Sequence, residues 1–319
     1  MNKKNLIRMA LSFSALAIAI SACSKQEMKQ AENATPANEA AQSAPEAAAA
    51  QSVSEVAAEQ AAAPAVEAPV ASAVTKTITL TDGATVTWIQ DNMGEKLNPR
   101  DLFSDASDSL YNSLNLPNGI PATVSTYLLK ADGEYVLFDA GLGAFGGQML
   151  THLNELGINP DDVQKVYLTH LHVDHINGLV RQSENGFEKV FKNAEVYVGQ
   201  IEKDAWMSME KNDLQKAILG VYNDKLKLFA FGDTLPHNVI AMDAVGHTPG
   251  HTVFQKSELL IIGDLMHGYA LQKDHPEINS NYDMDKEKSI EARKRILAYA
   301  KEHNLTMAGM HLPPPGFVK

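Results

Sequence analysis

The chain has very little cysteine and a shortage of positive charge. Cys23 is its only cysteine, so no disulfide can form within the chain and no thiolate can bind a metal further along. Its 27 lysine and arginine residues are outnumbered by 39 aspartate and glutamate residues, which gives a formal net charge of −12. Because an acidic chain repels phosphate backbones, we expect no nucleic-acid partner. Any metal site must use histidine and carboxylate side chains, which suit zinc and neighbouring transition metals.

Long hydrophobic runs are also lacking. The apolar run of residues 9–20 follows a basic start and is too short for a comfortable membrane span. It ends in Ile20-Ser21-Ala22-Cys23, which resembles the bacterial lipobox, in which the cysteine is lipidated and becomes the mature N-terminus. An ordinary cleaved signal with a chance cysteine is the alternative. We expect a signal peptide over 1–22 and a lipid anchor at Cys23, with several acyl chains giving stable attachment.

The expected location is therefore the bacterial cell envelope. Ser24, rather than aspartate, follows the cysteine, and this favours the outer membrane, with the protein facing the periplasm. Residues 31–74 then contain no glycine and no aromatic residue, and 19 of these 44 residues are alanine. Such a segment has too little to bury to offset its own ordering entropy. We interpret residues 23–75 as a disordered tether and residues 76–319 as the catalytic domain.

The domain shows short β-type runs first and a mixture of strands and helices later, which indicates an α/β fold with helices covering sheets. The expected strands are Ala84–Ile89, Ser125–Leu129, Tyr135–Asp139, Lys165–Thr169, Glu195–Val198, Val239–Ala244, Thr252–Gln255 and Leu259–Gly263. The expected helices are Gly147–Leu156, Ile201–Lys211, Asp213–Tyr222 and Lys286–His303.

The sharpest signal is Thr169-His170-Leu171-His172-Val173-Asp174-His175, directly after the apolar run Val166-Tyr167-Leu168. Four candidate metal ligands occur within six residues. On a strand, His170 and His172 would point the same way, and a turn after His172 would bring Asp174 and His175 to a second position nearby. One stretch can thus serve two metals. A histidine-rich surface loop is the alternative, and this spacing at a strand end argues against it.

This motif resembles the signature of the metallo-β-lactamase superfamily, and four further motifs of that family occur in the family's order, one before it and three after it. They are Phe138-Asp139-Ala140-Gly141, Gly246-His247-Thr248-Pro249-Gly250-His251, Ile262-Gly263-Asp264 and Met307-Ala308-Gly309-Met310-His311. The resemblance implies an αββα sandwich, with two mixed β-sheets flanked by helices. It covers most of the domain.

Carried over residue by residue, the resemblance implies two divalent metal ions, with zinc as the default. His170, His172 and His247 would hold the first ion, Asp174, His175 and His311 the second, and Asp264 would bridge both. Hydroxide shared by two such ions exists near neutral pH and would attack an ester-type centre. Asp174 and Asp264 are thereby the expected catalytic carboxylates, with Asp174 shuttling a proton.

Other residues are expected around the ligands. Asp139 and His251 are interpreted as groups that orient the ligands rather than bind metal. The sequence around the candidate ligands, including the segments that contain Phe145 and Trp206, resembles that of the methyl parathion hydrolase branch of the superfamily. This branch includes quorum-quenching lactonases. The resemblance places both aromatic rings in the substrate pocket, and His267 is a further pocket candidate.

The expected substrate is a small ester, most simply a lactone or a phosphotriester. A periplasm-facing β-lactamase is one alternative, although the bridging Asp264 speaks against it. A thioesterase like glyoxalase II is another, although the basic elements that bind glutathione are not evident. A metal-binding lipoprotein without activity is a third. The sequence does not decide between a monomer and a homodimer.

Overall fold

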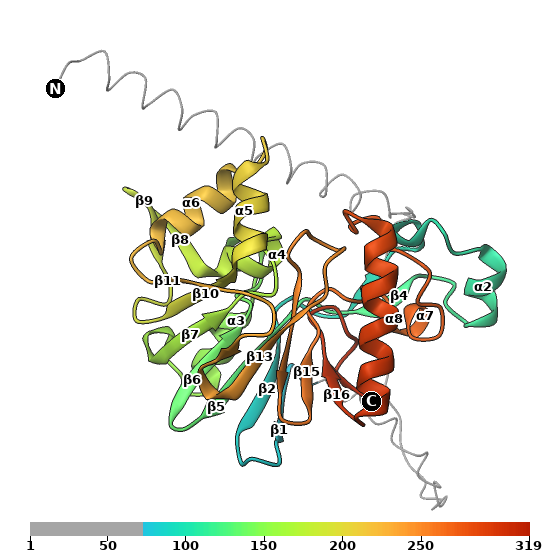
Figure 1. Cartoon of the computed structure of the whole chain (residues 1–319), viewed down its shortest axis with the longest axis horizontal. Coiled ribbons are helices and arrows are strands. Elements are labelled where there is room, and N and C mark those ends of the chain that lie inside the picture. Colours follow the sequence, from blue (N-terminus) through green and yellow to red (C-terminus); the bar gives the residue numbers. More distant parts are fainter. Residues whose placement is uncertain (1–72) are drawn as a thin grey trace, which may run out of the picture. The chain divides into compact units, whose positions relative to one another are not determined.

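The computed structural model of the protein describes residues 73–319 (Figure 1). The predicted signal peptide (1–22), Cys23 and the tether up to residue 72 lie outside the described residues. The predicted catalytic domain, 76–319, falls within them. Among residues 73–319, no helix combines the length and apolar character that crossing a bilayer requires.

A seven-stranded sheet contains the first half of the domain. Its order is β1 (Thr75–Thr79), β2 (Thr85–Gln90), β5 (Ser125–Ala131), β6 (Glu134–Phe138), β7 (Val163–Tyr167), β10 (Glu195–Gly199) and β11 (Leu226–Phe229). The strands from β1 to β6 pair antiparallel, while β6, β7, β10 and β11 pair parallel. Asp132 and Gly133 both have positive φ and form the tight turn between β5 and β6, as two-residue hairpins favour.

A six-stranded sheet contains the second half. Its order is β12 (Thr234–Leu235), β13 (Val239–Asp243), β14 (Thr252–Lys256), β15 (Leu259–Ile261), β16 (Thr306–Ala308) and β17 (Phe317–Val318). Only β15 and β16 pair parallel in this sheet. Both large sheets are therefore mixed, as predicted.

Short ribbons and helices complete the described part of the chain. The ribbons are β3 (Lys96–Asn98) with β4 (Ile120–Ala122) and β8 (Val180–Ser183) with β9 (Gly186–Lys189). The α-helices are α2 (Asp108–Ser113), α3 (Met149–Glu155), α4 (Val173–Ile176), α5 (Gln200–Ser208), α6 (Asp213–Val221), α7 (Tyr269–Gln272) and α8 (Lys286–Glu302). The 3-10 turns are η1 (Arg100–Phe103), η2 (Gly143–Phe145), η3 (Pro160–Asp162), η4 (Asn177–Leu179) and η5 (Pro236–Asn238).

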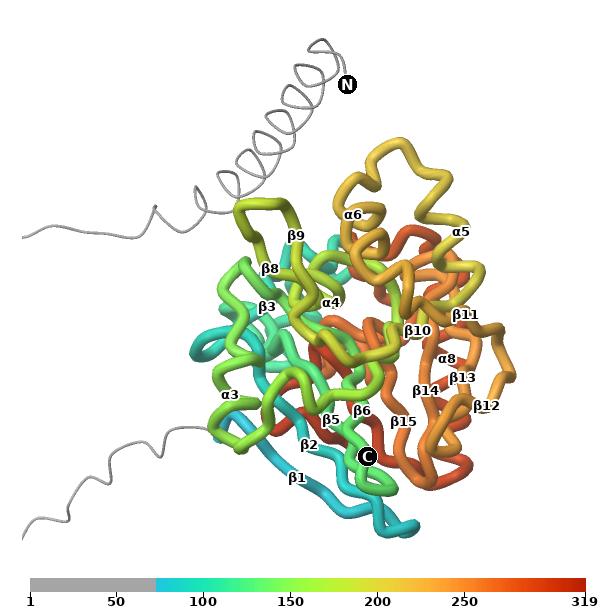
Figure 2. Tube along the Cα trace, turned by 90° about the vertical axis from the view of Figure 1, so that its left-hand side faces the viewer, coloured from blue at the N-terminus to red at the C-terminus, as the bar shows by residue number. Residues whose placement is uncertain are grey.

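The buried apolar side chains form layers between these elements. One cluster joins the seven-stranded sheet to α3, α5 and α6, a second fills the space between the two sheets, and a third joins the six-stranded sheet to α8. Figure 1 shows α8 on the outer face of the β13–β16 sheet, and Figure 2 views the domain from the side of α3 and α4. The predicted αββα sandwich is confirmed.

Every predicted strand and helix overlaps an observed element. The short segments were not anticipated, among them β3, β4, α4 and α7. Each is only three or four residues long, which is too short for a helical or an alternating pattern to mark it.

Candidate metal centre

Five strand ends meet at one edge of the sandwich, and each is followed by a predicted site motif. Asp139 follows β6 and the histidine motif follows the parallel strand β7. In the other sheet, β13, β15 and β16 run in the same direction, and they lead to His247, Asp264 and His311. Because the carboxyl ends of strands with one direction lie at one edge, the fold brings together residues up to 172 positions apart, from Asp139 to His311.

The predicted strand Lys165–Thr169 ends two residues early in the structure, and His170 and His172, whose side chains would point the same way on a strand, lie beyond it. Strand β7 ends at Tyr167, because the Thr169 N–H donates to Asp139 Oδ1 at 2.8 Å instead of to a neighbouring strand. The Leu171 N–H donates to Glu202 Oε1 at 2.9 Å. His172 then becomes the first residue before the short helix α4, which carries Asp174 and His175. Side-chain acceptors, rather than strand pairing, therefore give this segment its shape.

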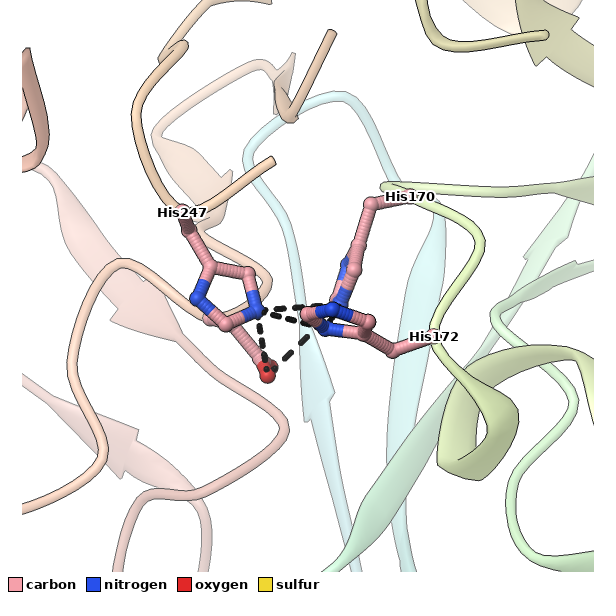
Figure 3. A group of neighbouring side chains, drawn as sticks. His170, His172 and His247 are labelled. Atoms are coloured by element: carbon pink, nitrogen blue, oxygen red, sulfur yellow. Dashed lines mark hydrogen bonds and ion pairs between the residues drawn. The ribbon is translucent and has the colours of Figure 1, made fainter. Parts of the chain in front are cut away.

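Three imidazole rings nevertheless converge on one point (Figure 3). His172 Nδ1 lies 3.0 Å from His170 Nε2 and 2.9 Å from His247 Nε2, and the third side of the triangle is 3.2 Å. Asp264 Oδ2 lies 3.3 Å from His247 Nε2 and 3.7 Å from His170 Nε2. These four residues therefore present one ligand atom each to a common centre.

A second group lies on the other side of Asp264. Asp264 Oδ1 is 3.1 Å from His175 Nε2, and His311 Nε2 is 3.4 Å from Asp174 Oδ2. Asp174, His175 and His311 again offer atoms that face one another. Asp264 Oδ1 thus faces His175, whereas Asp264 Oδ2 faces His247 and also lies 3.1 Å from His311 Nε2. The Asp264 carboxylate therefore contacts both groups.

The contacts fit a cation better than they fit hydrogen bonds. The three ring nitrogens lie 2.9–3.2 Å from one another. One proton shared among them cannot satisfy the lone pairs of all three nitrogens. The spacing is close to the ~3.3 Å edge of a tetrahedron whose corners lie about 2.0–2.1 Å from zinc. In the second group, His175 Nε2 and Asp264 Oδ1 are buried without a hydrogen-bond partner among the described residues. The donor set of histidine nitrogens and carboxylate oxygens suits zinc.

The electrostatics also favour bound positive charge. Burial lowers the pKa of His170 well below its usual value and lowers that of His172 to about 3, so both rings stay neutral and keep a lone pair. Burial acts in the same direction on His175, but the Asp264 and Asp174 carboxylates outweigh it and hold the pKa of His175 well above its usual value. The second group therefore attracts a proton or a metal ion.

Further side chains hold the candidate ligands in place. Asp139 Oδ2 lies 2.7 Å from His175 Nδ1, and His251 Nε2 accepts the Asp264 N–H at 3.0 Å. Both contacts are of the orienting kind expected for Asp139 and His251. Asp283 Oδ1 lies 3.0 Å from His247 Nδ1 and was not predicted. A carboxylate on the far nitrogen fixes the ring orientation of a ligand histidine.

Glu202 on α5 was also missed from the sequence. Its buried carboxylate accepts from Leu171 N, Trp206 Nε1, Thr248 Oγ1 and Gly250 N at 2.7–2.9 Å. Burial raises the pKa of Glu202, while these four donors oppose the rise. One helix carboxylate therefore joins the loop of His170 and His172 to the loop of His247. In the sequence it is an ordinary acidic residue of a helix.

The three predicted pocket residues lie in different environments. His267 is buried, its ring stacks on that of His311 with centroids 4.9 Å apart, and its Nε2 lies 3.1 Å from Asp264 Oδ2. Trp206 is largely buried and meets the His172 ring edge-on at 5.5 Å. Phe145, on η2, is 45% exposed, so its ring is free to contact a ligand.

A family model decides the classification. The model of the metallo-beta-lactamase superfamily matches residues 119–311, more than half of the chain. The chain belongs to the metallo-beta-lactamase superfamily. The resemblance found in the sequence is thereby confirmed, and so is the prediction of a metal-dependent hydrolase of this superfamily.

Solved structures of this superfamily resemble the chain along most of their length. Hydrolase AbOPH of the beta lactamase superfamily is 26% identical with a TM-score of 0.68, over 78% of this chain and 93% of that one. AidC, a dizinc quorum-quenching lactonase, is 25% identical with a TM-score of 0.66, over 77% and 94%. An N-acyl homoserine lactone hydrolase, 18% identical with a TM-score of 0.55 over 76% and 100%, shares the fold. No curated protein matches the chain.

Proposed function

We propose that this metallo-beta-lactamase-fold hydrolase binds two divalent metal ions, most simply zinc, and opens small lactones by hydrolysis. His170, His172 and His247 hold one ion in this proposal, and Asp174, His175 and His311 hold the other. Asp264 bridges them.

The relation of Asp264 to the two groups carries the proposal. Its Oδ2 atom lies 3.3 Å from His247 Nε2, and its Oδ1 atom lies 3.1 Å from His175 Nε2. Its Oδ2 atom also lies 3.1 Å from His311 Nε2, so Asp264 contacts both groups. A site for one ion would need no carboxylate shared between two groups, since each group alone already offers three histidine or aspartate side chains. The use of histidine and aspartate alone also distinguishes this site from sites in which a cysteine thiolate binds the second metal.

Ions bound here would supply a water that ionises near neutral pH and a positive charge beside the ester carbonyl. The residues supply geometry and proton transfer. Asp264 fixes the separation of the two groups, and Asp139 and Asp283 fix the rings of His175 and His247. Asp174 is the ligand carboxylate with a quarter of its side chain exposed, so substrate approaches past it. In this proposal Asp174 passes a proton to the leaving oxygen.

A lactone is proposed as the substrate because two features agree. AidC, 25% identical over 94% of its length, is a quorum-quenching lactonase. The ring of Phe145, 45% exposed, offers apolar surface to an acyl chain, and the largely buried Trp206 supports the His172 ring behind it. A phosphotriester offers a similar electrophilic centre and is the second candidate substrate.

The test is hydrolysis by the purified full chain after zinc loading, with four substrates: an acyl lactone, an activated phosphotriester, nitrocefin and a glutathione thioester. We expect turnover of the lactone that a chelator abolishes and that the double variant His170→Ala/His172→Ala lacks. Turnover of nitrocefin alone would indicate a β-lactamase, and turnover of the thioester alone would indicate a thioesterase. Inactivity on all four would reject hydrolysis of these classes.

We also propose that Cys23 carries a lipid that attaches the protein to the bacterial cell envelope. The support is the lipobox-like Ile20-Ser21-Ala22-Cys23 and the lack of any other cysteine. Metabolic labelling with a fatty acid should mark the wild-type protein in membranes, whereas Cys23→Ala should remain unlabelled. Equal labelling of both proteins would contradict the anchor.

A further inference from the structure

The ribbon of β3 and β4 turns one face toward the candidate metal centre. Lys96 and Asn98 lie on the same face of β3, opposite Ala122 and Ile120 on β4. Asn98 Nδ2 donates to the His267 carbonyl oxygen at 2.6 Å. A Cβ atom added to Gly268 would lie 2.9 Å from Ile120 Cδ1, so this face packs directly on the loop after Asp264.

A second contact joins the same ribbon to the centre. The residue after Ala122 is Thr123, whose carbonyl oxygen lies 2.8 Å from His311 Nδ1. Asn98 and Thr123 therefore join the ribbon that carries Lys96 to His267 and His311. The residue between Lys96 and Asn98, Leu97, points away and is 50% exposed.

Among residues 73–319, the Lys96 ammonium has one hydrogen-bond partner. Its Nζ donates to Asn98 Oδ1. No described carboxylate forms an ion pair with it. Burial lowers the pKa of Lys96, and the carboxylates of Asp174 and Asp264 oppose that shift at longer range. Both of these are candidate metal ligands, so their charge would be neutralised by bound ions. The ammonium then has two N–H donors and no anion of its own.

We propose that the Lys96 ammonium binds the oxygen of the substrate that becomes anionic during hydrolysis, and then the carboxylate of the product. This rests on the proposed lactone hydrolysis. In that reaction the water oxygen bonds to the acyl carbon and the acyl C–O bond of the ring breaks. One proton of the water goes to the ring oxygen, which becomes a hydroxyl group, and the other is released as the carboxyl group ionises. Asn98 acts as the positioning residue that holds the ammonium.

The experiment measures binding of γ-hydroxybutyrate, the product of γ-butyrolactone, to the zinc-loaded full chain by calorimetry, with neutral butanediol as the comparison ligand. Lys96→Met and Lys96→Gln should weaken γ-hydroxybutyrate binding about 10- to 100-fold, the range for loss of a charge-assisted hydrogen bond. They should leave butanediol binding unchanged. Lys96→Arg should retain most of the binding, because it keeps the positive charge.

The matched control is Lys130→Met, at an exposed position of β5, which should bind γ-hydroxybutyrate like the wild type. Zinc content and melting temperature of each variant identify a folding defect. Unchanged γ-hydroxybutyrate binding in folded, zinc-loaded Lys96→Met or Lys96→Gln would overturn the proposal, and so would an equal loss for butanediol.

The two proposals fail separately. A wild-type protein that hydrolyses lactones, with γ-hydroxybutyrate binding independent of Lys96, keeps the function and rejects the role of Lys96. A protein that binds γ-hydroxybutyrate through Lys96 but hydrolyses no lactone keeps the anion site and rejects the function.

Discussion

The Glu202 carboxylate accepts the N–H of Leu171 at 2.9 Å, in the middle of the segment that joins His170 to His172. Gln215 Nε2 donates to the carbonyl oxygen of the same residue at 3.0 Å. Leu171 is thus held on both sides of its backbone by side chains of two helices. The positions of the two histidines depend on α5 and α6 as much as on the strand before them.

Removing the charge of Glu202 should therefore loosen the site. In Glu202→Gln the new NH₂ group faces backbone and indole donors, so at least one buried donor loses its acceptor. We expect a loss of about 2–4 kcal/mol in the free energy of unfolding, measured by urea denaturation of the zinc-loaded protein. Glu188→Gln, at an exposed position of β9, should stay within about 0.5 kcal/mol of the wild type. Equal stability of the two variants would show that the Glu202 contacts are dispensable.

Two glycine-to-alanine variants should have opposite effects. A Cβ atom at Gly263 would lie 2.5 Å from His251 Nε2, and φ is +52° there. We expect Gly263→Ala to displace Asp264, to destabilise the protein by about 1–3 kcal/mol and to lower its zinc content. Gly220, inside α6, has open space around it, and Gly220→Ala should stabilise the protein by up to about 1 kcal/mol. Thermal unfolding and metal analysis measure both, and full zinc content in Gly263→Ala would contradict the expected displacement.

Asp283 should affect metal affinity through His247. Asp283→Asn replaces the carboxylate on His247 Nδ1 by a neutral group, and we expect zinc affinity to fall about 10- to 100-fold. Competition with a chromophoric chelator measures this affinity directly. Asp274→Asn, an exposed surface change, serves as the control and should bind zinc like the wild type. The same affinity in both variants would mean that Asp283 serves only its ion pair with Arg293.

Phe145 should influence substrate choice rather than stability. Its side chain is 45% exposed, so truncation removes little buried area from the folded protein. We expect Phe145→Ala to raise KM for long-acyl lactones more than for short ones, because a longer chain buries more apolar surface on the ring. Leu228→Ala, 43% exposed on β11, is the matched control and should leave KM unaffected. The same KM change for all chain lengths would place Phe145 outside the acyl-binding surface.

The sequence predicted the long elements and pointed to seven candidate ligands, which the fold brings together, and both have a physical reason. Strand β15 is a continuous apolar run and β7 ends in the apolar pair Val166-Tyr167. Several histidine and aspartate residues grouped at the ends of such strands are typical of a metal site. The residues that the sequence did not reveal act through tertiary contacts. Glu202, Asp283 and Lys96 are ordinary charged residues of a helix, a loop and a short strand. Their importance arises only when the two sheets bring distant segments together.

The shape of the histidine segment shows the same limit. The apolar run Val166-Tyr167-Leu168 predicts a strand up to Thr169, with the two histidines at its end. Asp139, 30 residues earlier than Thr169, ends that strand by accepting the Thr169 N–H. Local patterning cannot reveal such a partner, because the competing acceptor, Asp139, follows a different strand, β6.

The most direct test of the dinuclear site is anomalous X-ray diffraction at the zinc edge from crystals of the zinc-loaded protein. Two peaks are predicted. One should lie within ligand distance of His170 Nε2, His172 Nδ1 and His247 Nε2, and the other within ligand distance of Asp174, His175 and His311, with Asp264 between them. A single peak, or two peaks that do not share Asp264, would contradict the account.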